Sequence, residues 1–273
     1  MLVFAVKLPL FPFHSWLLNA HVEAPMGGSI ILAAVLLKLG FFGLIRFPLG
    51  LFHEISVSMA PAVIFLALVG IFYSAVLSIT EVDAKRLVAL TSIAHMGMCV
   101  IGLFIFDAQG FYGAILLALG HAVISSALFF LVGIMYERFE TRDINALGGL
   151  VHVMPLFSSA FFFFAVANAG FPCSLSFLGE FFIMIGTVKS IGFAPFIVII
   201  VSSVLLLYSN LKMFINICFG TIADGKISNT VSDLTHLELV AVLTLVVYAG
   251  ELLIFNNVYF STLYADALTR YIY

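Results

Sequence analysis

Apolar segments follow one another along almost the whole chain, and only short polar stretches separate them. A helix needs about 20 predominantly apolar residues to cross a hydrocarbon layer roughly 30 Å thick. The sequence therefore predicts an all-α fold, a polytopic transmembrane helical bundle with about eight spans. Their approximate limits are residues 1–21, 26–47, 54–80, 84–106, 111–137, 153–188, 193–220 and 236–256.

Composition excludes an ordinary soluble domain. Hydrophobic residues make up 63% of the 273 positions and charged residues 9%, whereas soluble domains carry about 25% charged residues. Lipids are therefore the expected surroundings. The net charge is −3 and no basic block is present, which argues against nucleic acid as a partner. Cys99, Cys173 and Cys218 show no metal-ligand spacing, so we expect small buried side chains and no metal site.

Prolines interrupt two of the predicted spans. Pro9 and Pro12 lie in the first, and Pro172 lies near the middle of the unusually long sixth. Proline lacks a backbone N–H and clashes with the preceding turn, so each helix should break there. Broken helices in lipid need protein or a wet cavity around the freed backbone groups, and a pair of them indicates an ion pathway. The alternative is a proline that merely kinks a packed helix.

Ionisable residues lie inside these apolar spans. Lys7 directly precedes the first break, Lys38 lies within the second span, and Glu180 follows the second break. A charged group at bilayer depth costs about 2.5–3.5 kcal/mol or more, so its presence indicates a function. Amino and carboxyl groups can both exchange protons, which favours a proton relay over a static ion pair.

His95 and His121 also fall deep in spans. An imidazole can accept a proton on one nitrogen and release one from the other, as a relay requires. The alternatives are hydrogen-bonded core histidines or haem ligands, although one histidine per helix is too few for a two-haem arrangement. The sequence has no Gly-rich phosphate loop, no paired CxxC, no HExxH and no nucleophile elbow. No other chemistry is predicted.

The segment from Lys7 to Lys38, KLPLFPFHSWLLNAHVEAPMGGSIILAAVLLK, resembles the central signature of the antiporter-like subunits of respiratory complex I, most closely those of the chain 4 type. The resemblance covers nearly the whole chain. Further matches are Asp83 to Arg86, Ser92, His95-Met96, His121 to Ser126, Tyr136 to Arg138, Thr141-Arg142, Asn168, Gly170, Pro172, Gly179 to Phe181 and Phe219-Gly220.

The resemblance implies a role for each buried ionisable residue. Lys7 is similar to the titrating lysine of the entry half-channel, and Lys38 to the bridging lysine of the next helix. His95 and His121 match positions on a hydrophilic axis, and Glu180 matches the glutamate typical of chain 4. The expected proton path follows the sequence order, from Lys7 through Lys38, His95 and His121 to Glu180.

The resemblance also implies an architecture, the second half of an antiporter-like inverted-repeat protein. Residues 1–273 would form a single transmembrane domain. Within it, 1–47 would end the first repeat, 54–188 would form the second, and 189–273 would supply C-terminal spans.

The implied function is proton translocation in the membrane arm of complex I, coupled to NADH:ubiquinone electron transfer. The chain would be a subunit of the proton-translocating NADH:ubiquinone reductase without redox chemistry of its own. NADH, FMN, iron–sulfur clusters and ubiquinone are expected elsewhere in the complex, and other membrane-arm subunits are the expected partners. The expected location is the mitochondrial inner membrane, with a bacterial plasma membrane as the alternative.

Two departures from the family pattern concern its broken helices. Leu18-Asn19 replaces a usual Pro-Asp pair, and Cys173 replaces a usual glycine. Because the chain begins shortly before Lys7, we expect the first span to be partial and to lack the helix whose glutamate would pair with Lys7. The expectation is a split subunit completed by a separate N-terminal polypeptide, and a degenerate remnant is the alternative.

Two rival functions remain open at this point. A subunit of a multisubunit cation/proton antiporter would share these motifs, and copurifying electron-transfer subunits would separate the two. A structural membrane subunit that retains the fold without pumping is the second rival. Neutralising Lys38 and Glu180 without effect on transport would support it.

Overall fold

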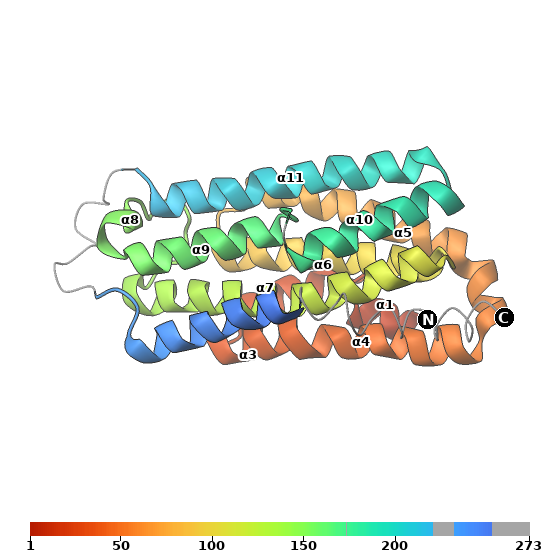
Figure 1. Cartoon of the computed structure of the whole chain (residues 1–273), viewed down its shortest axis with the longest axis horizontal. Helices are drawn as coiled ribbons and strands as arrows, with labels where there is room; N and C mark the ends of the chain where they lie inside the picture. Colours follow the sequence, from red (N-terminus) through yellow and green to blue (C-terminus); the bar gives the residue numbers. More distant parts are fainter. Residues whose placement is uncertain (173, 221–231, 253–273) are drawn as a thin grey trace.

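A computed structural model of the chain describes residues 1–172, 174–220 and 232–252. Its helices run side by side along the long axis of one bundle (Figure 1). Across the described ranges the only extended pairing is the isolated bridge between Asp83 and Asp143. The predicted all-α fold is confirmed. Cys173 and the last residues of the eighth predicted span lie outside the described residues.

Five of the predicted spans form continuous helices that are long and apolar enough to cross a membrane. Four are single α-helices: α5 (His53–Thr80), α6 (Ala84–Phe104), α7 (Ala108–Phe139) and α11 (Phe193–Cys218). The fifth covers residues 26–49 and alternates α3 (Met26–Ile31), the π-helical η1 (Leu32–Leu36), α4 (Leu37–Leu44) and the π-helical η2 (Ile45–Leu49). A further helix is described over residues 236–252.

The two remaining spans are broken where the prolines lie. The first consists of α1 (Leu2–Lys7) and α2 (Ser15–Glu23), and Pro9 and Pro12 fall between them. The sixth consists of α9 (Pro155–Asn168) and α10 (Leu175–Ser190), preceded by the short α8 (Leu150–Val153). Figure 1 shows α9 and α10 end to end, with the break near the middle of the bundle.

Helix starts follow the usual capping chemistry. Asp83 and Asp107 accept hydrogen bonds from the backbone N–H groups two residues on, at the starts of α6 and α7. Ser174 accepts from Phe177 N in the same way at the start of α10. A side-chain acceptor at the N-cap satisfies one of the first N–H groups of a helix, which have no partner within it. Ser174 therefore allows α10 to restart directly after the break.

The core of the bundle is built around α6. Every residue of this helix except Arg86 is buried, and α5, α7, α2 and α10 pack around it. A helix that is apolar all round is stable only when other helices or lipid surround it. His95 on α6 therefore lies in the centre of the protein.

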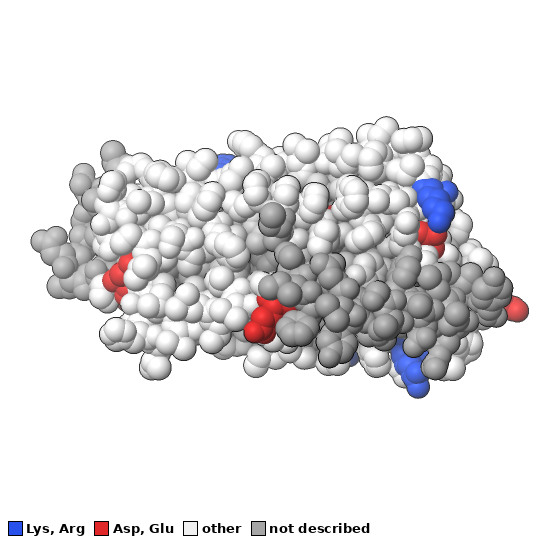
Figure 2. Space-filling view, viewed as in Figure 1, with Lys and Arg blue, Asp and Glu red and all other residues white. Residues whose placement is uncertain are grey.

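The outer surface is apolar. Large side chains such as Phe42, Phe65 and Val204 are more than half exposed. Figure 2 shows that charged side chains are sparse on one face and lie mostly toward the two ends. An apolar surface of this extent suits hydrocarbon rather than water.

Basic side chains at the bundle ends donate hydrogen bonds to the last backbone carbonyls of helices. Lys85 Nζ donates to Ala24 O at 2.8 Å, and Arg142 Nη1 donates to Val22 O at 2.7 Å, both at the end of α2. Lys212 Nζ donates to Ile79 O at 2.9 Å, at the end of α5. The last carbonyls of a helix lack helical partners and attract cations, so these residues hold helix ends in place.

Candidate functional site

The break between α9 and α10 leaves one carbonyl without a helical partner. In an uninterrupted helix, Asn168 O would accept from the N–H four residues on, but that residue is Pro172. Gly170 turns the chain with φ +70°. A Cβ at Gly170 would lie 2.6 Å from Glu180 Oε2, so only glycine lets this carboxylate approach the break.

Glu180 meets His95 beside the break. Glu180 Oε1 on α10 lies 3.2 Å from His95 Nδ1 on α6, and both side chains are buried. The distance is that of an ion pair, but the atoms are not aligned as a hydrogen bond. A deprotonated carboxylate and a bare ring nitrogen are both acceptors and would repel each other. The contact is therefore favourable when the pair holds a proton.

The other ring nitrogen of His95 faces the freed carbonyl. His95 Nε2 lies 3.0 Å from Asn168 O. A carbonyl oxygen can only accept, so Nε2 must carry the hydrogen of this bond. Nδ1 is then the nitrogen that gains or loses a proton next to Glu180.

Lys38 lies at the end of the site opposite Glu180. It directly follows the junction of η1 and α4, and Lys38 Nζ donates to Ala33 O at 2.7 Å. Its second contact is with His121 Nδ1 on α7, at 2.9 Å. Short π-helical segments within α-helices often occur at functional sites.

The two histidine rings connect the Lys38–His121 contact with the His95–Glu180 contact. The rings of His95 and His121 lie 5.3 Å apart, centre to centre, at an angle of 54°. Among the described residues His121 Nε2 has no hydrogen-bond partner. The spatial series is therefore Lys38, His121, His95 and Glu180. We define these four residues, of which His95, His121 and Glu180 are buried and Lys38 is partly buried, as the buried series.

The order of the histidines corrects the expected path, which placed His95 before His121. Chain order differs from spatial order here because Lys38 on α4 contacts His121 on α7, whereas Glu180 on α10 contacts His95 on α6. His121 thus faces Lys38, and His95 faces the broken helix. Four separate helices supply the four side chains.

Lys7 lies outside the buried series. Its side chain is exposed, and within the described ranges it makes no hydrogen bond or ion pair. Its Cβ lies 3.1 Å from the position that a Cβ at Gly40 would occupy, so it packs against α4. The predicted role of Lys7 remains a prediction.

Some parts of the site were not predicted. The π-helical segment before Lys38 has no signal in a uniformly apolar run. The role of the Asn168 carbonyl could have been found, because a proline four residues later always frees a carbonyl. Cys99 and Cys218 are buried and free, as expected.

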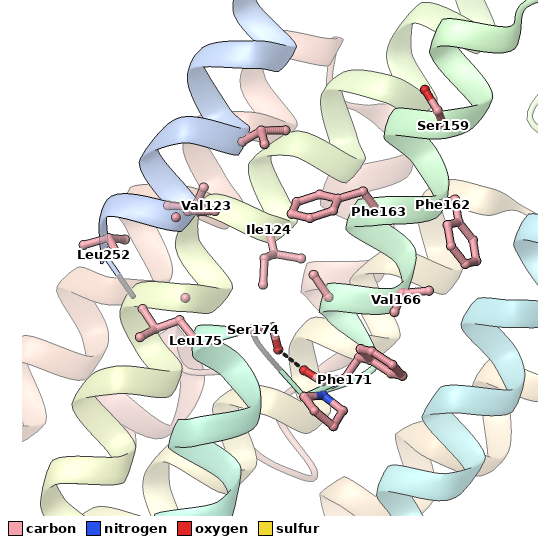
Figure 3. A pocket seen from close by; sticks show the side chains of 16 residues that line it. Val123, Ile124, Ser159, Phe162, Phe163, Val166, Phe171, Ser174, Leu175 and Leu252 are labelled. Carbon is pink, nitrogen blue, oxygen red and sulfur yellow. Dashed lines mark hydrogen bonds between the residues drawn. The ribbon is translucent and has the colours of Figure 1, made fainter. Parts of the chain in front are cut away.

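Two cavities reach the break. The larger, of about 660 Å³, has an almost wholly apolar lining that includes Ile124, Phe163 and Phe171 (Figure 3). It reaches none of the buried series. The smaller, of about 220 Å³, lies between α10 and α11 and is lined by Glu180, Gly170 and Ser203. Only the smaller cavity is therefore in contact with a proton-exchanging group.

No metal centre is formed by the residues that the structure describes. They contain no group of three or more His, Cys, Asp or Glu side chains placed to hold an ion. The buried series holds two histidines and one carboxylate along a line rather than around a point. Its arrangement suits proton transfer.

Comparisons with known proteins agree with this geometry. The family model described as "NADH:quinone oxidoreductase/Mrp antiporter, TM" matches residues 1–207. NADH-ubiquinone oxidoreductase chain 4 of Chondrus crispus is 37% identical over 276 aligned residues, which cover 95% of this chain and 53% of the relative. Chain 4 of Triticum aestivum is 46% identical over 183 residues, covering 67% of this chain and 37% of the relative. This chain spans about half the length of the first relative.

Solved structures show the same fold. A chain of respiratory complex I from Thermus thermophilus, with bound NADH, superposes with a TM-score of 0.89 at 28% identity, covering 99% of this chain and 56% of that one. A chain of the Mrp complex from Dietzia sp. DQ12-45-1b superposes with a TM-score of 0.88 at 19% identity, covering 99% and 58%. The latter shows similarity of fold alone. By the match over residues 1–207 and these relatives, the chain belongs to the NADH:quinone oxidoreductase/Mrp antiporter transmembrane family.

Proposed function

We propose that the chain is a membrane-arm subunit of a complex I-type NADH:ubiquinone oxidoreductase and carries protons along the buried series. The observation that carries this proposal is the pair of contacts at its ends. Lys38 lies 2.9 Å from His121, and His95 lies 3.2 Å from Glu180, inside a bundle with an apolar outer surface. Buried ionisable groups at membrane depth are expensive, and a connected line of them is typical of a proton pathway.

The first transfer starts at Lys38. Its ammonium donates to His121 Nδ1, so movement of this proton leaves a neutral lysine and a protonated imidazole. The Nε2 hydrogen of His121 has no partner in the described ranges and is the proton available to move on. Its acceptor is His95 Nδ1, on the neighbouring ring. Lys38 returns to its charged form by taking up the next proton, and His121 can accept again once its hydrogen has moved from Nδ1 back to Nε2.

The second transfer ends at Glu180. His95 Nδ1 passes its proton to Glu180 Oε1, and the two groups share one proton before and after the step. The small cavity lined by Glu180 and Ser203 leaves open space beside the carboxylate, from which the proton would pass to an acceptor outside the buried series. An unpaired charge is costly in the surrounding apolar core, so until that step the proton stays on the residues of the buried series.

The proposal assigns electron transfer to other subunits. The printed names of the curated relatives favour the oxidoreductase over a cation/proton antiporter, although the family includes both. NADH, FMN, iron–sulfur clusters and ubiquinone would then bind elsewhere, and the neighbours of this chain would be other membrane-arm subunits. Relatives from a red alga and a plant support the mitochondrial inner membrane as the location of this multi-pass protein.

Lys7 needs an acidic partner for a role at the entry of the path. An exposed lysine on a membrane-spanning element is unfavourable unless another group approaches it. The proposal places that acidic group on another segment or subunit of the assembled complex. A crosslink from position 7 to a neighbouring polypeptide would identify it.

Substitution of Lys38 tests the function. Lys38→Ala removes the start of the buried series, and we expect proton translocation per NADH oxidised to fall at least tenfold in sealed vesicles that contain the assembled complex. Lys212→Ala is the matched control, because Lys212 also donates to a backbone carbonyl but lies outside the series. Undiminished translocation by Lys38→Ala at normal assembly would refute the relay and support a structural role.

A further inference from the structure

The orientation of His95 within the buried series depends on a hydrogen bond to an uncharged group. His95 Nε2 donates to Asn168 O, the carbonyl that Pro172 deprives of its helical partner. The position of Asn168 therefore decides which nitrogen of His95 faces Glu180. This inference rests on the proposed function.

The side chain of Asn168 is held from two sides. Asn168 Nδ2 donates to Thr91 Oγ1 on α6 at 3.0 Å and to Asn210 Oδ1 on α11 at 3.1 Å. All three side chains are buried. Thr91 lies one helical turn before His95, so α6 holds both the carbonyl and the amide of Asn168. We define Asn168, Thr91 and Asn210 as the amide bracket.

The direction of each hydrogen bond in the amide bracket is set by its surroundings. Thr91 Oγ1 donates its hydrogen to Val88 O at 2.8 Å, so it can only accept from Asn168. Asn210 Nδ2 donates to Leu206 O at 2.9 Å, which turns Asn210 Oδ1 toward Asn168. Two acceptors therefore face position 168, and an amide supplies the two donors that they need.

We propose that Asn168 is a positioning residue that makes His95 a proton site with a single working nitrogen. Nε2 keeps its hydrogen, because the Asn168 carbonyl cannot take up a proton. Nδ1 therefore both receives the proton from the His121 side and releases it to Glu180 Oε1. The ring stores a proton next to the carboxylate and does not pass protons through from one nitrogen to the other.

Thr91 offers a test that leaves the buried series intact. Thr91→Val keeps the size of the side chain and removes the acceptor for Asn168, and Thr91→Ser keeps the hydroxyl. Loss of a hydrogen bond of this kind changes an equilibrium about twofold to tenfold. We expect Thr91→Val to lower proton translocation per NADH oxidised by that factor in the assembled complex, and Thr91→Ser to restore it.

Thr187→Val is the matched control. Thr187 is also buried, and among the described residues its hydroxyl bonds only to a carbonyl of its own helix, Ile183 O, so its loss should leave translocation unchanged. The second measurement places Thr91→Val on a His95→Ala background. If Asn168 acts through His95, the double variant should match His95→Ala alone.

Three results would overturn the inference. They are normal translocation by Thr91→Val, a further loss on the His95→Ala background, or failure of Thr91→Val and Asn210→Ala alike to assemble, which would make the bracket purely structural. If His95→Ala itself translocates protons normally, the proposed relay is wrong. If His95→Ala is impaired and Thr91→Val is not, only the role of Asn168 is wrong.

Discussion

In both broken helices a proline leaves a backbone carbonyl without its helical donor, but different groups bond to the two freed carbonyls. In the first, Pro9 deprives Ala5 O of its helical donor, and Leu10 N takes that place at 2.9 Å. The carbonyl of the next residue, Val6 O, accepts a hydrogen bond from Trp16 Nε1 at 2.9 Å. In the second, Pro172 frees Asn168 O, and the group that takes the place is His95.

The difference teaches that a break by itself does not make a proton site. A backbone N–H and an indole N–H cannot give up their hydrogens near neutral pH, so the first break is closed by groups that do not titrate. The group at the second break is an imidazole with a second ring nitrogen that contacts Glu180. The group that satisfies the freed carbonyl decides whether a break takes part in proton transfer.

Lys38 differs from Lys85 and Lys212 in a similar way. Lys85 and Lys212 each donate to a carbonyl at a helix end. Lys38 also donates to a carbonyl, and in addition contacts the titratable ring of His121. Of these three lysines, Lys38 alone therefore contacts a side chain that can take its proton.

Among substitutions that alter the backbone or the capping groups of the two breaks, the larger effect is expected from closing the gap at the second. Gly170→Ala places a Cβ 2.6 Å from Glu180 Oε2 and also strains a backbone with φ +70°. The carboxylate must move away from the break, so proton translocation should fall several-fold. The strain alone costs about 1–2 kcal/mol of stability.

Gly220→Ala separates the two causes. Gly220 has φ +100°, and no atom of the described residues lies within 4 Å of its Cβ position, so its substitution adds strain without a clash against them. Translocation should be normal for Gly220→Ala at comparable thermal stability. Equal losses in both variants would show that backbone strain, and not the approach of Glu180, controls translocation.

The smallest effect is expected at the first break. Trp16→Phe removes the bond to Val6 O and keeps an aromatic ring. Trp16 is partly exposed, so we expect a loss of about 0.5–1.5 kcal/mol in stability and no change in translocation. Thermal unfolding and vesicle assays of the same preparation would check this. A severalfold loss of translocation at normal assembly would show that both breaks take part.

The fold was largely predictable, because hydrocarbon sets the length of each span and both breaks contain proline, although Pro48 and Pro61 lie inside helices that continue through them. The spatial order of the site was not. Helix α6 is buried on nearly every side, so its sequence has no polar face to show where His95 points. The neighbours of His95 and His121 depend on which helices pack together. The amide bracket joins residues 77 and 42 positions apart in the sequence, so local patterns carry no trace of it.

The central claim is that the proton reaches Glu180 from His95, and Glu180→Gln tests it most directly. The substitution keeps the size of the side chain and removes the group that takes the proton. The measurement is proton translocation per NADH oxidised by the assembled complex in sealed vesicles, with Glu251→Gln as the control at a carboxylate outside the buried series. The account predicts at least a tenfold loss for Glu180→Gln and none for the control. Full translocation by Glu180→Gln at normal assembly would contradict it.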